Sequence, residues 1–144
     1  MTTSDMLSLI KDKFALAGSD PAQYSPLSLA FIGDSVYGLI VKTMVVLEGN
    51  CPANRLDAKA VKHVKAISQA KAADHLLEMG FFTEEETAIY RRGRNAKSPT
   101  TAKNAPVGDY RKATGLEAVI GYLYLMGQTD RVVDIIREAV KVAG

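Results

Sequence analysis

Hydrophobic positions recur at helical spacing along most of the chain, and the alternation typical of strands is almost absent. Ser4 can cap a first amphipathic helix that carries Leu7, Ile10 and Phe14 on one face and ends near Gly18. The pattern therefore predicts an all-α fold. Its length of 144 residues is that of one domain, so we expect a single domain over residues 1–144.

The most apolar run, Leu27–Leu47, follows the clearest helix start in the sequence. Ser25 stands at the cap position and Pro26 at the first helical position, and we expect this helix to end near Glu48. The run has about the length of a membrane span, but an acid such as Asp34 costs roughly 2.5–3.5 kcal/mol at a bilayer centre. With no basic stretch leading into an apolar segment at the N-terminus, we expect a buried helix in a cytoplasmic protein without a membrane partner.

The rest of the chain predicts further helices around one polar segment. A helical stretch begins near residue 54 and continues or restarts up to Gly80, with Val61, Val64 and Ile67 turned inward. A capping box of the Thr-x-x-Glu type is expected to open the next helix. The remaining ranges are 83–86 for the capping box, 93–108 for an irregular polar segment, and about 110–126 and 130–142 for the last two helices.

Two acidic residues stand inside otherwise apolar helices. Asp34 lies within Leu27–Leu47, and Glu117 lies in the uncharged range 116–125, and neither has a lysine or arginine three or four positions away. Each has a glycine four residues later, Gly38 and Gly121, which would let another helix approach the acidic face. An ionised carboxylate taken out of water needs a compensating partner. If the two helices cross, the facing carboxylates would bind a hard cation such as Mg²⁺.

Both acids also have a purely structural interpretation. Asp34 could be a helix N-cap after Gly33, although Ser25 already supplies a start. Thr114 and Glu117 fit the spacing of a capping box about as well as that of a metal site. Spacing alone leaves both interpretations open.

Basic residues gather in two places, although the net charge of the whole chain is only +2. The range 87–108 contains no acid and has cations mixed with small polar residues, which is typical of surfaces that contact phosphate and sugar oxygens. Its candidate residues for such contacts, with a nucleic acid as the binding partner, are Arg91, Arg92, Arg94, Asn95, Lys97, Lys103 and Asn104. A second stripe, which could equally be a solvated helix face, consists of Arg55, Lys59, Lys62 and Lys65.

The remaining reactive residue types predict no further site. Cys51 is the only cysteine, so a disulfide within the chain and a cysteine-rich zinc site are excluded, and we interpret it as structural. His63 and His75 are more than a helical turn apart on a polar stretch, which argues against a histidine metal site.

The acidic segments resemble two motifs of one enzyme family. The segment 29–37, Leu-Ala-Phe-Ile-Gly-Asp-Ser-Val-Tyr, resembles the signature helix of ribonuclease III catalytic domains, and 114–125, Thr-Gly-Leu-Glu-Ala-Val-Ile-Gly-Tyr-Leu-Tyr-Leu, resembles their second acidic helix. The segment 91–97 with Lys103-Asn104 is more specifically similar to Mini-III, a bacterial branch without an appended double-stranded-RNA-binding domain. The resemblance runs from about residue 25 to residue 125.

This resemblance implies an all-helical ribonuclease III-like fold and an endoribonuclease that cuts double-stranded RNA. It implies dependence on Mg²⁺, for which Mn²⁺ can substitute, with Asp34 and Glu117 as catalytic and metal-binding acids. It also implies a homodimer that matures the ends of the large-subunit (23S) ribosomal RNA precursor, with a ribosomal protein on that precursor as a further partner.

The sequence departs from ordinary ribonuclease III at two acidic positions. One turn before each acid, the family has a further carboxylate, where this chain has Ala30 and Thr114. Mini-III proteins share this reduced set, which supports the branch but weakens a direct transfer of a two-metal mechanism. Two alternatives stay open: a catalytically inactive double-stranded-RNA-binding module of the same fold, and a helical protein-interaction domain.

Overall fold

The computed structural model describes residues 6–97 and 106–143, which form helices and turns with no strand in those ranges. This confirms the predicted all-α class. The elements, in chain order, are α1 (Met6–Lys13), the short 3₁₀ helix η1 (Pro21–Gln23), α2 (Pro26–Glu48), α3 (Ala53–Val64), α4 (Ala66–Glu78), α5 (Glu84–Asn95), α6 (Val107–Leu125) and α7 (Thr129–Ala143).

Local sequence signals predicted the starts of α2 and α5 correctly. The Ser25 hydroxyl accepts from the backbone N–H of Ser28 at 3.1 Å, and α2 runs from Pro26 to Glu48 as expected. Thr83 and Glu86 form the predicted capping box, in which each side chain accepts from the other's backbone N–H. The third helical stretch restarts rather than continues, because Lys65 adopts an extended conformation between α3 and α4.

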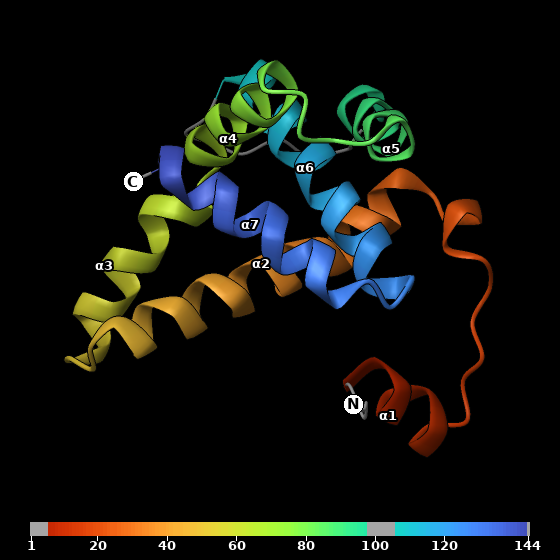
Figure 1. The fold of residues 1–144 in the computed structure, drawn as a ribbon, viewed down its shortest axis with the longest axis horizontal. Coiled ribbons are helices and arrows are strands. Elements are labelled where there is room, and N and C mark those ends of the chain that lie inside the picture. Colours follow the sequence, from red (N-terminus) through yellow and green to blue (C-terminus); the bar gives the residue numbers. More distant parts are fainter. Residues whose placement is uncertain (1–5, 98–105, 144) are drawn as a thin grey trace.

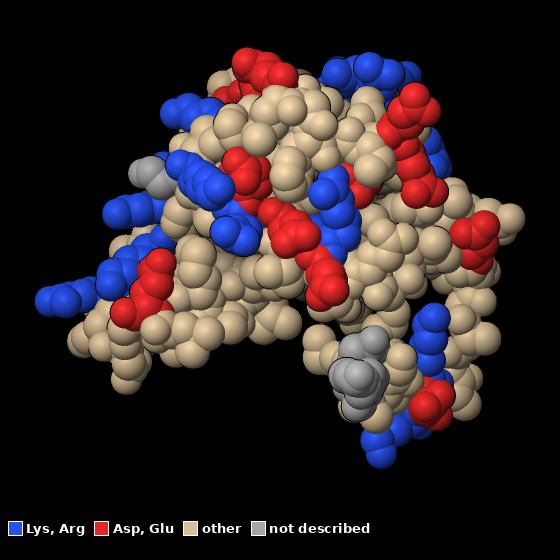
Figure 2. All heavy atoms as spheres, in the orientation of Figure 1, with Lys and Arg blue, Asp and Glu red and all other residues tan. Residues whose placement is uncertain are grey.

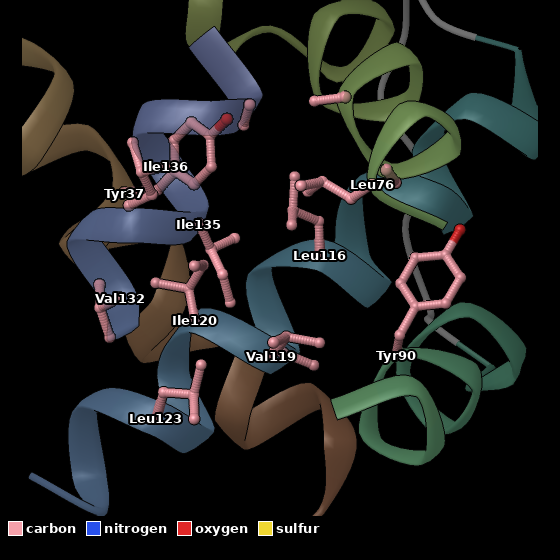
Figure 3. Packing of buried hydrophobic residues seen from close by; sticks show 14 of the residues in the cluster. Tyr37, Leu76, Tyr90, Leu116, Val119, Ile120, Leu123, Val132, Ile135 and Ile136 are labelled. Carbon is pink, nitrogen blue, oxygen red and sulfur yellow. The ribbon is translucent and has the colours of Figure 1, made fainter. Parts of the chain in front are cut away.

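Helix α6 occupies the centre of the fold, and α2, α4, α5 and α7 pack around it (Figure 1). Buried residues lie on all sides of α6, and they include Leu116, Val119, Ile120 and Leu123. Figure 3 shows these side chains among those of the neighbouring helices. A helix that is apolar on every side is typical of a core position, which explains why its sequence lacks an amphipathic pattern.

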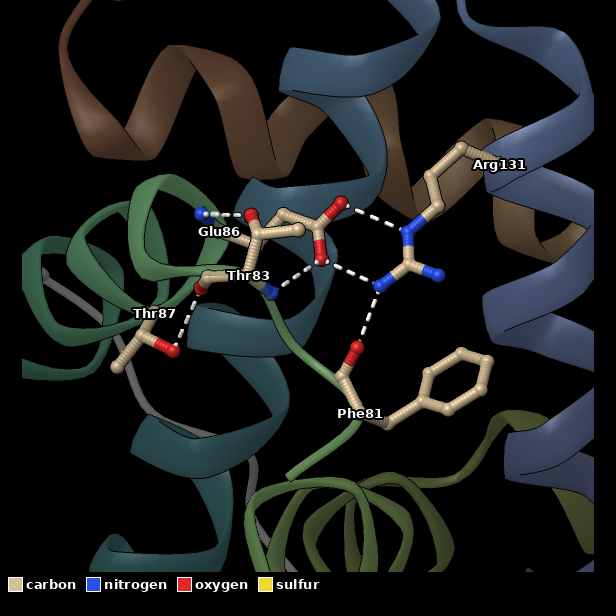
Figure 4. Close-up of polar contacts among 5 residues, drawn as sticks. All are labelled: Phe81, Thr83, Glu86, Thr87 and Arg131. Atoms are coloured by element: carbon tan, nitrogen blue, oxygen red, sulfur yellow. Dashed lines mark hydrogen bonds and ion pairs between the residues drawn. The ribbon is translucent and has the colours of Figure 1, made fainter. Parts of the chain in front are cut away.

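A buried ion pair fixes α5 against α7. Glu86 is only 3% exposed, and Arg131 binds both of its carboxylate oxygens, with Nε to Oε2 at 2.8 Å and Nη2 to Oε1 at 2.7 Å. The same guanidinium donates to the carbonyl of Phe81 and lies over its ring, 4.6 Å from the centroid (Figure 4). Because both carboxylate oxygens of Glu86 accept hydrogen bonds in this arrangement, we assign Glu86 a structural role.

Some predicted burial is wrong. Val61 is 43% exposed, because Ala60 is the buried residue of α3, and Ile67 near the start of α4 is 38% exposed. Val64, also predicted to turn inward, is partly buried against the core. None of the residues of α1 is buried, and the helix ends at Lys13 rather than near Gly18. The predicted start of that helix at Ser4 lies outside the described residues.

Helix α2 is buried on one face only. It is long and apolar enough to cross a membrane by length and composition, and 39% of its most apolar window is buried inside the structure. Leu29, Tyr37, Val41 and Val45 face the core, as the sequence predicted for the whole helix. The opposite face is exposed, which corrects that expectation.

Candidate active site

The predicted site is built where α2 and α6 cross at very short range. A Cβ added to Gly33 would overlap the carbonyl oxygen of Glu117 and lie 2.8 Å from the backbone nitrogen of Gly121. A Cβ added to Gly121 would in turn overlap the carbonyl oxygen of Leu29. Each helix backbone therefore occupies the space in which the other would carry a side chain, and only glycine allows this approach.

The glycines of this crossing were predicted half correctly. Gly121 has the expected role. Gly38 does not, because nothing lies within 4 Å of an added Cβ there. The crossing point falls one residue before Asp34 rather than one turn after it, so Gly33 is the glycine that meets α6. The spacing from the acid was a poor guide, because the contact depends on which face of α2 turns toward α6.

The crossing brings Asp34 and Glu117 together, as the sequence predicted. The two side chains are close enough to hydrogen-bond, and the pKa of Glu117 is raised to about 9, first by burial, then by the charge of Asp34 and by that hydrogen bond. The side chain of Gln69 acts in the opposite direction and lowers this pKa. Two carboxylates at this distance cannot both ionise cheaply without a cation.

The surroundings of the two acids differ more than expected. Glu117 is partly buried, whereas Asp34 is exposed on the surface of α2, so the prediction that both are embedded is wrong for Asp34. The apolar run around Asp34 belongs to a helix with only one buried face. Within the described part of the chain, no lysine or arginine forms a salt bridge with either acid.

Both purely structural interpretations of the acids are excluded by the helix bounds. Asp34 lies in the interior of α2, which Ser25 already caps. Thr114 and Glu117 lie inside α6, which begins at Val107, and the Thr114 hydroxyl donates to the carbonyl of Tyr110 at 3.0 Å instead of capping a helix. Neither acid is thus needed to begin a helix.

A cleft of about 390 Å³ opens over the acid pair. Its lining combines the two carboxylates with apolar and hydroxyl-bearing side chains: Leu27, Ala30, Phe31, Asp34, Tyr110, Thr114 and Glu117. Ala30 and Thr114, one turn before the acids, lie in the same wall and contribute no carboxylate. No group of three or more acidic, histidine or cysteine side chains that could hold a metal occurs among residues 6–97 and 106–143.

The basic segment has a different structure from the one predicted. Helix α5 continues to Asn95, and Gly93 is buried against α6, where an added Cβ would lie 2.9 Å from the Cβ of Ala118. Gly93 was expected to begin an irregular segment, but it is a packing residue of a second close helix contact. The cations before residue 96 therefore lie on a helix and have fixed positions.

The predicted RNA-binding residues differ in their contacts. Arg91, Arg92, Asn95 and Lys97 are exposed, and Arg94 is partly exposed beside the ring of Tyr90, 5.7 Å from its centroid. Arg92 donates to the backbone carbonyls of Ala22 and Tyr24, each at 3.4 Å, so it also fastens α5 to the segment before α2. Lys103 and Asn104 lie outside the described residues.

The second basic stripe lies away from the cleft. Lys59 and Lys62 are exposed on α3, which packs against the C-terminal half of α2 beside Val45 and Val46. Figure 2 shows cations along the α3 side of the molecule, at the left of this view. No lysine or arginine is among the described residues that line the cleft over the acids.

Sequence reasoning missed one polar neighbour of the site. Gln69 of α4 is 1% exposed, and its side chain reaches Glu117. The signal available in the sequence was a glutamine beside a helix face of small residues, Ala70, Ala72 and Ala73, all of which are buried. Without knowledge of which helix packs there, that signal could not be assigned to the acids.

Comparison with known proteins identifies the class of this fold and site. The ribonuclease III domain family matches residues 27–128, which include both acids and the helices that carry them. A solved structure of protein FN1578 from Fusobacterium nucleatum is similar, with a TM-score of 0.75 and 29% identity over 86% of this chain and 98% of that one.

Curated relatives specify the branch. The chain is 43% identical to Mini-ribonuclease 3 of Thermoanaerobacter sp., over 95% of both proteins. It is 42% identical to Mini-ribonuclease 3 of Staphylococcus aureus, over 82% of this chain and 88% of that protein. The chain therefore belongs to the ribonuclease III family, in its Mini-ribonuclease 3 branch. By this membership it is an endoribonuclease, a hydrolase that takes part in RNA processing.

Proposed function

We propose that this protein cleaves double-stranded RNA with the help of a divalent metal ion held by Asp34 and Glu117. The observation that carries the proposal is the pairing of two carboxylates from distant parts of the sequence. They are close enough to share a hydrogen bond, they border an open cleft, and no lysine or arginine of the described residues pairs with them.

The residues present suit a hard divalent cation. Two carboxylates supply oxygen ligands, and Mg²⁺ commonly takes its remaining ligands from water and substrate phosphate. The raised pKa of Glu117 means that ionising this buried acid beside Asp34 is costly. A cation between the two carboxylates would lower that cost. Mg²⁺, or Mn²⁺ in its place, would supply Lewis-acid chemistry by making a water more acidic and neutralising charge on the scissile phosphate.

The two acids have different parts in this proposal. Asp34 is exposed at the cleft and would meet the substrate side of the site, while Glu117, half-buried in α6, holds the inner side. Both acids lie on helices whose backbones are in close contact, so their carboxylate oxygens are held in place before substrate arrives. With Ala30 and Thr114 beside them, the protein offers too few ligands to hold two ions tightly by itself.

Cations of α5 would bind the phosphates that flank the cut. The proposed contacts come from Arg91, Arg92, Arg94, Asn95 and Lys97, together with Lys103 and Asn104. Side chains cannot read the deep, narrow major groove of A-form RNA, so recognition would rest on shape and 2′-hydroxyl contacts. Affinity should then fall steeply as salt rises, in proportion to the number of phosphates neutralised.

The exposed face of α2 supports a homodimer. Phe31, which borders the cleft, is 80% exposed, and Leu39 and Val46 are 52% and 46% exposed on the same helix. Large apolar side chains gathered on one helix are typical of a surface that another protein covers. A second copy related by a two-fold axis would place one site on each RNA strand.

The biological setting follows from the family. We propose that the substrate is the precursor of large-subunit (23S) ribosomal RNA, processed in the cytoplasm with a ribosomal protein bound to it. What supports this is the likeness to the Mini-ribonuclease 3 proteins and to Mini-III motifs, rather than any feature of the cleft.

The alternative is an inactive RNA-binding module, which the reduced set of two acids favours. The test is incubation of long duplex RNA with the protein, with and without Mg²⁺, read on a sizing gel, alongside Asp34→Asn. We expect shortened fragments only with Mg²⁺ and only from the unmodified protein, while Asp34→Asn still binds duplex. Binding without cleavage in Mg²⁺ or Mn²⁺ would support the module, and no binding at low salt would contradict both.

A further inference from the structure

Gln69 is a polar side chain in a place that should be apolar. It lies on α4 and is only 1% exposed. The other buried residues of this helix include three alanines and, two turns after Gln69, Leu76. Its Nε2 atom is one of three buried side-chain atoms in the described residues without a hydrogen-bond partner of normal geometry. A buried donor left without a partner is costly, so its presence calls for a state of the protein in which it is used.

The group that Gln69 reaches is the carboxylate of Glu117. The Gln69 side chain is close enough to lower the pKa of Glu117, which means that the amide stabilises the ionised carboxylate. In the structure, Glu117 also hydrogen-bonds to Asp34, an interaction that raises its pKa and requires a proton between the two acids. Glu117 thus has two side-chain neighbours within hydrogen-bonding reach, Asp34 and Gln69, and of these Gln69 carries an amide N–H that can donate to a carboxylate.

Tyr37 provides a comparison within the same core. Its hydroxyl is also buried without a hydrogen-bond partner among the described residues, and its ring packs in the interior (Figure 3). Tyr37 interacts with Glu117 through charge alone, whereas the Gln69 side chain lies within hydrogen-bonding reach of Glu117. Being buried and unpartnered does not by itself connect a residue to the acid, but the contact of Gln69 does.

We propose that Gln69 is a positioning residue for Glu117. Its buried amide, on a helix that packs against α6, donates to one carboxylate oxygen and so holds the other oxygen toward Asp34. This inference rests on the proposed function, in which both acids are ionised around a divalent ion.

The test replaces Gln69 with a side chain of similar length that cannot donate, Gln69→Met, and uses Tyr37→Phe as the matched control. Mn²⁺ and Mg²⁺ affinity is measured by calorimetric titration of the RNA-free protein, together with the melting temperature without metal and the cleavage of duplex RNA. Loss of a hydrogen-bonding neighbour of a metal ligand typically lowers metal affinity or activity by 10- to 100-fold. We expect that range for Gln69→Met, a melting temperature without metal that is unchanged or higher, and partial recovery of cleavage at high Mn²⁺.

Tyr37→Phe should bind Mn²⁺ within about twofold of the unmodified protein. Equal losses in both variants would overturn the inference, because they would indicate a general disturbance of the core. The inference would also be overturned if Gln69→Met bound Mn²⁺ normally. The same holds if the variant unfolded, or melted at a lower temperature with unchanged metal affinity, because Gln69 would then have only a structural role. If the unmodified protein neither binds a divalent ion nor cuts duplex RNA, the proposed function fails and this inference fails with it, which distinguishes that outcome from the others.

Discussion

The crossing of α2 with α6 and the basic segment on α5 both belong to the proposed site, but they are held in different ways. At the crossing, backbone meets backbone at Gly33 and Gly121, so the positions of Asp34 and Glu117 are set by contacts that tolerate no added atom. Arg91 on α5 and Lys97 just beyond its end are exposed on the surface. The comparison indicates that the acids are placed by backbone contacts that exclude any side chain, whereas the proposed RNA contacts come from exposed side chains on a helix whose backbone is packed.

Arg92 and Gly93 show that the two regions are not fully separate. Gly93 packs against α6 close to Gly115, and Arg92 fastens α5 to the segment that precedes α2. The helix that carries the cations is therefore positioned against the two helices that carry the acids. This places a basic helix at a fixed orientation to the cleft, although none of its described cations lines the cleft.

The largest expected effect comes from adding a methyl group at the crossing. Gly33→Ala should destabilise the protein by at least about 3 kcal/mol, because the new Cβ would overlap the α6 backbone and the helices would have to separate. Chemical denaturation followed by circular dichroism measures this change. Gly38→Ala is the matched control on the same helix, and it should raise stability by up to about 1 kcal/mol, because its added Cβ meets nothing within 4 Å. Equal effects in the two variants would mean that the helices do not cross as described.

A pH effect of intermediate size should come from Glu117 in the metal-free protein. Its pKa is about 9 in the folded state against an ordinary 4.5, so the folded state binds the proton more tightly. The free energy of unfolding should therefore fall as pH rises from about 4.5 toward about 9, with a slope of up to about 1.4 kcal/mol per pH unit from this group.

Glu117→Gln separates this contribution from those of other titrating groups. The difference in stability between the unmodified protein and the variant, measured in urea at several pH values with a chelator present, should carry the slope. Saturating Mg²⁺ should reduce it, because the ion favours the ionised acids. A difference that is flat between pH 5 and 9 would show that the two carboxylates do not share a proton.

The smallest expected effects distinguish neighbouring arginines on α5. Arg91→Ala should weaken binding to unrelated duplexes about equally and reduce the slope of log affinity against log salt by about 1, with the melting temperature unchanged. Arg92→Ala should also weaken binding without sequence preference, and should cost about 0.5–1.5 kcal/mol of stability through its lost backbone contacts. Filter binding at several salt concentrations, with thermal melting, checks both. A loss that depended strongly on sequence would contradict recognition by shape.

Local signals in the sequence were sufficient for much of the fold. The start of α2 at Ser25-Pro26 and of α5 at the Thr83–Glu86 capping box depend on residues within one turn, and both were predicted correctly. The resemblance to the two family motifs predicted the acid pair, whereas the spacing of Asp34 and Glu117 alone left open whether their helices cross.

What could not be predicted depends on which faces meet. The roles of Gly33 and Gly93 follow from the crossing points of helices, and Gln69 joins the site only because α4 packs on α6. The exposure of Asp34 follows from the single buried face of α2, since hydrophobic composition does not reveal that the other face stays exposed in this chain. These features depend on how the helices pack in three dimensions, which no short stretch of the sequence specifies.

Diffraction from crystals soaked in Mn²⁺, recorded at a wavelength where manganese scatters anomalously, tests the central claim most directly. We predict an anomalous peak between Asp34 and Glu117 in contact with an oxygen of each, and no such peak in crystals of Asp34→Asn. Well-ordered carboxylates without a peak at saturating Mn²⁺, or a peak only at other residues, would contradict a shared ion at the α2–α6 crossing.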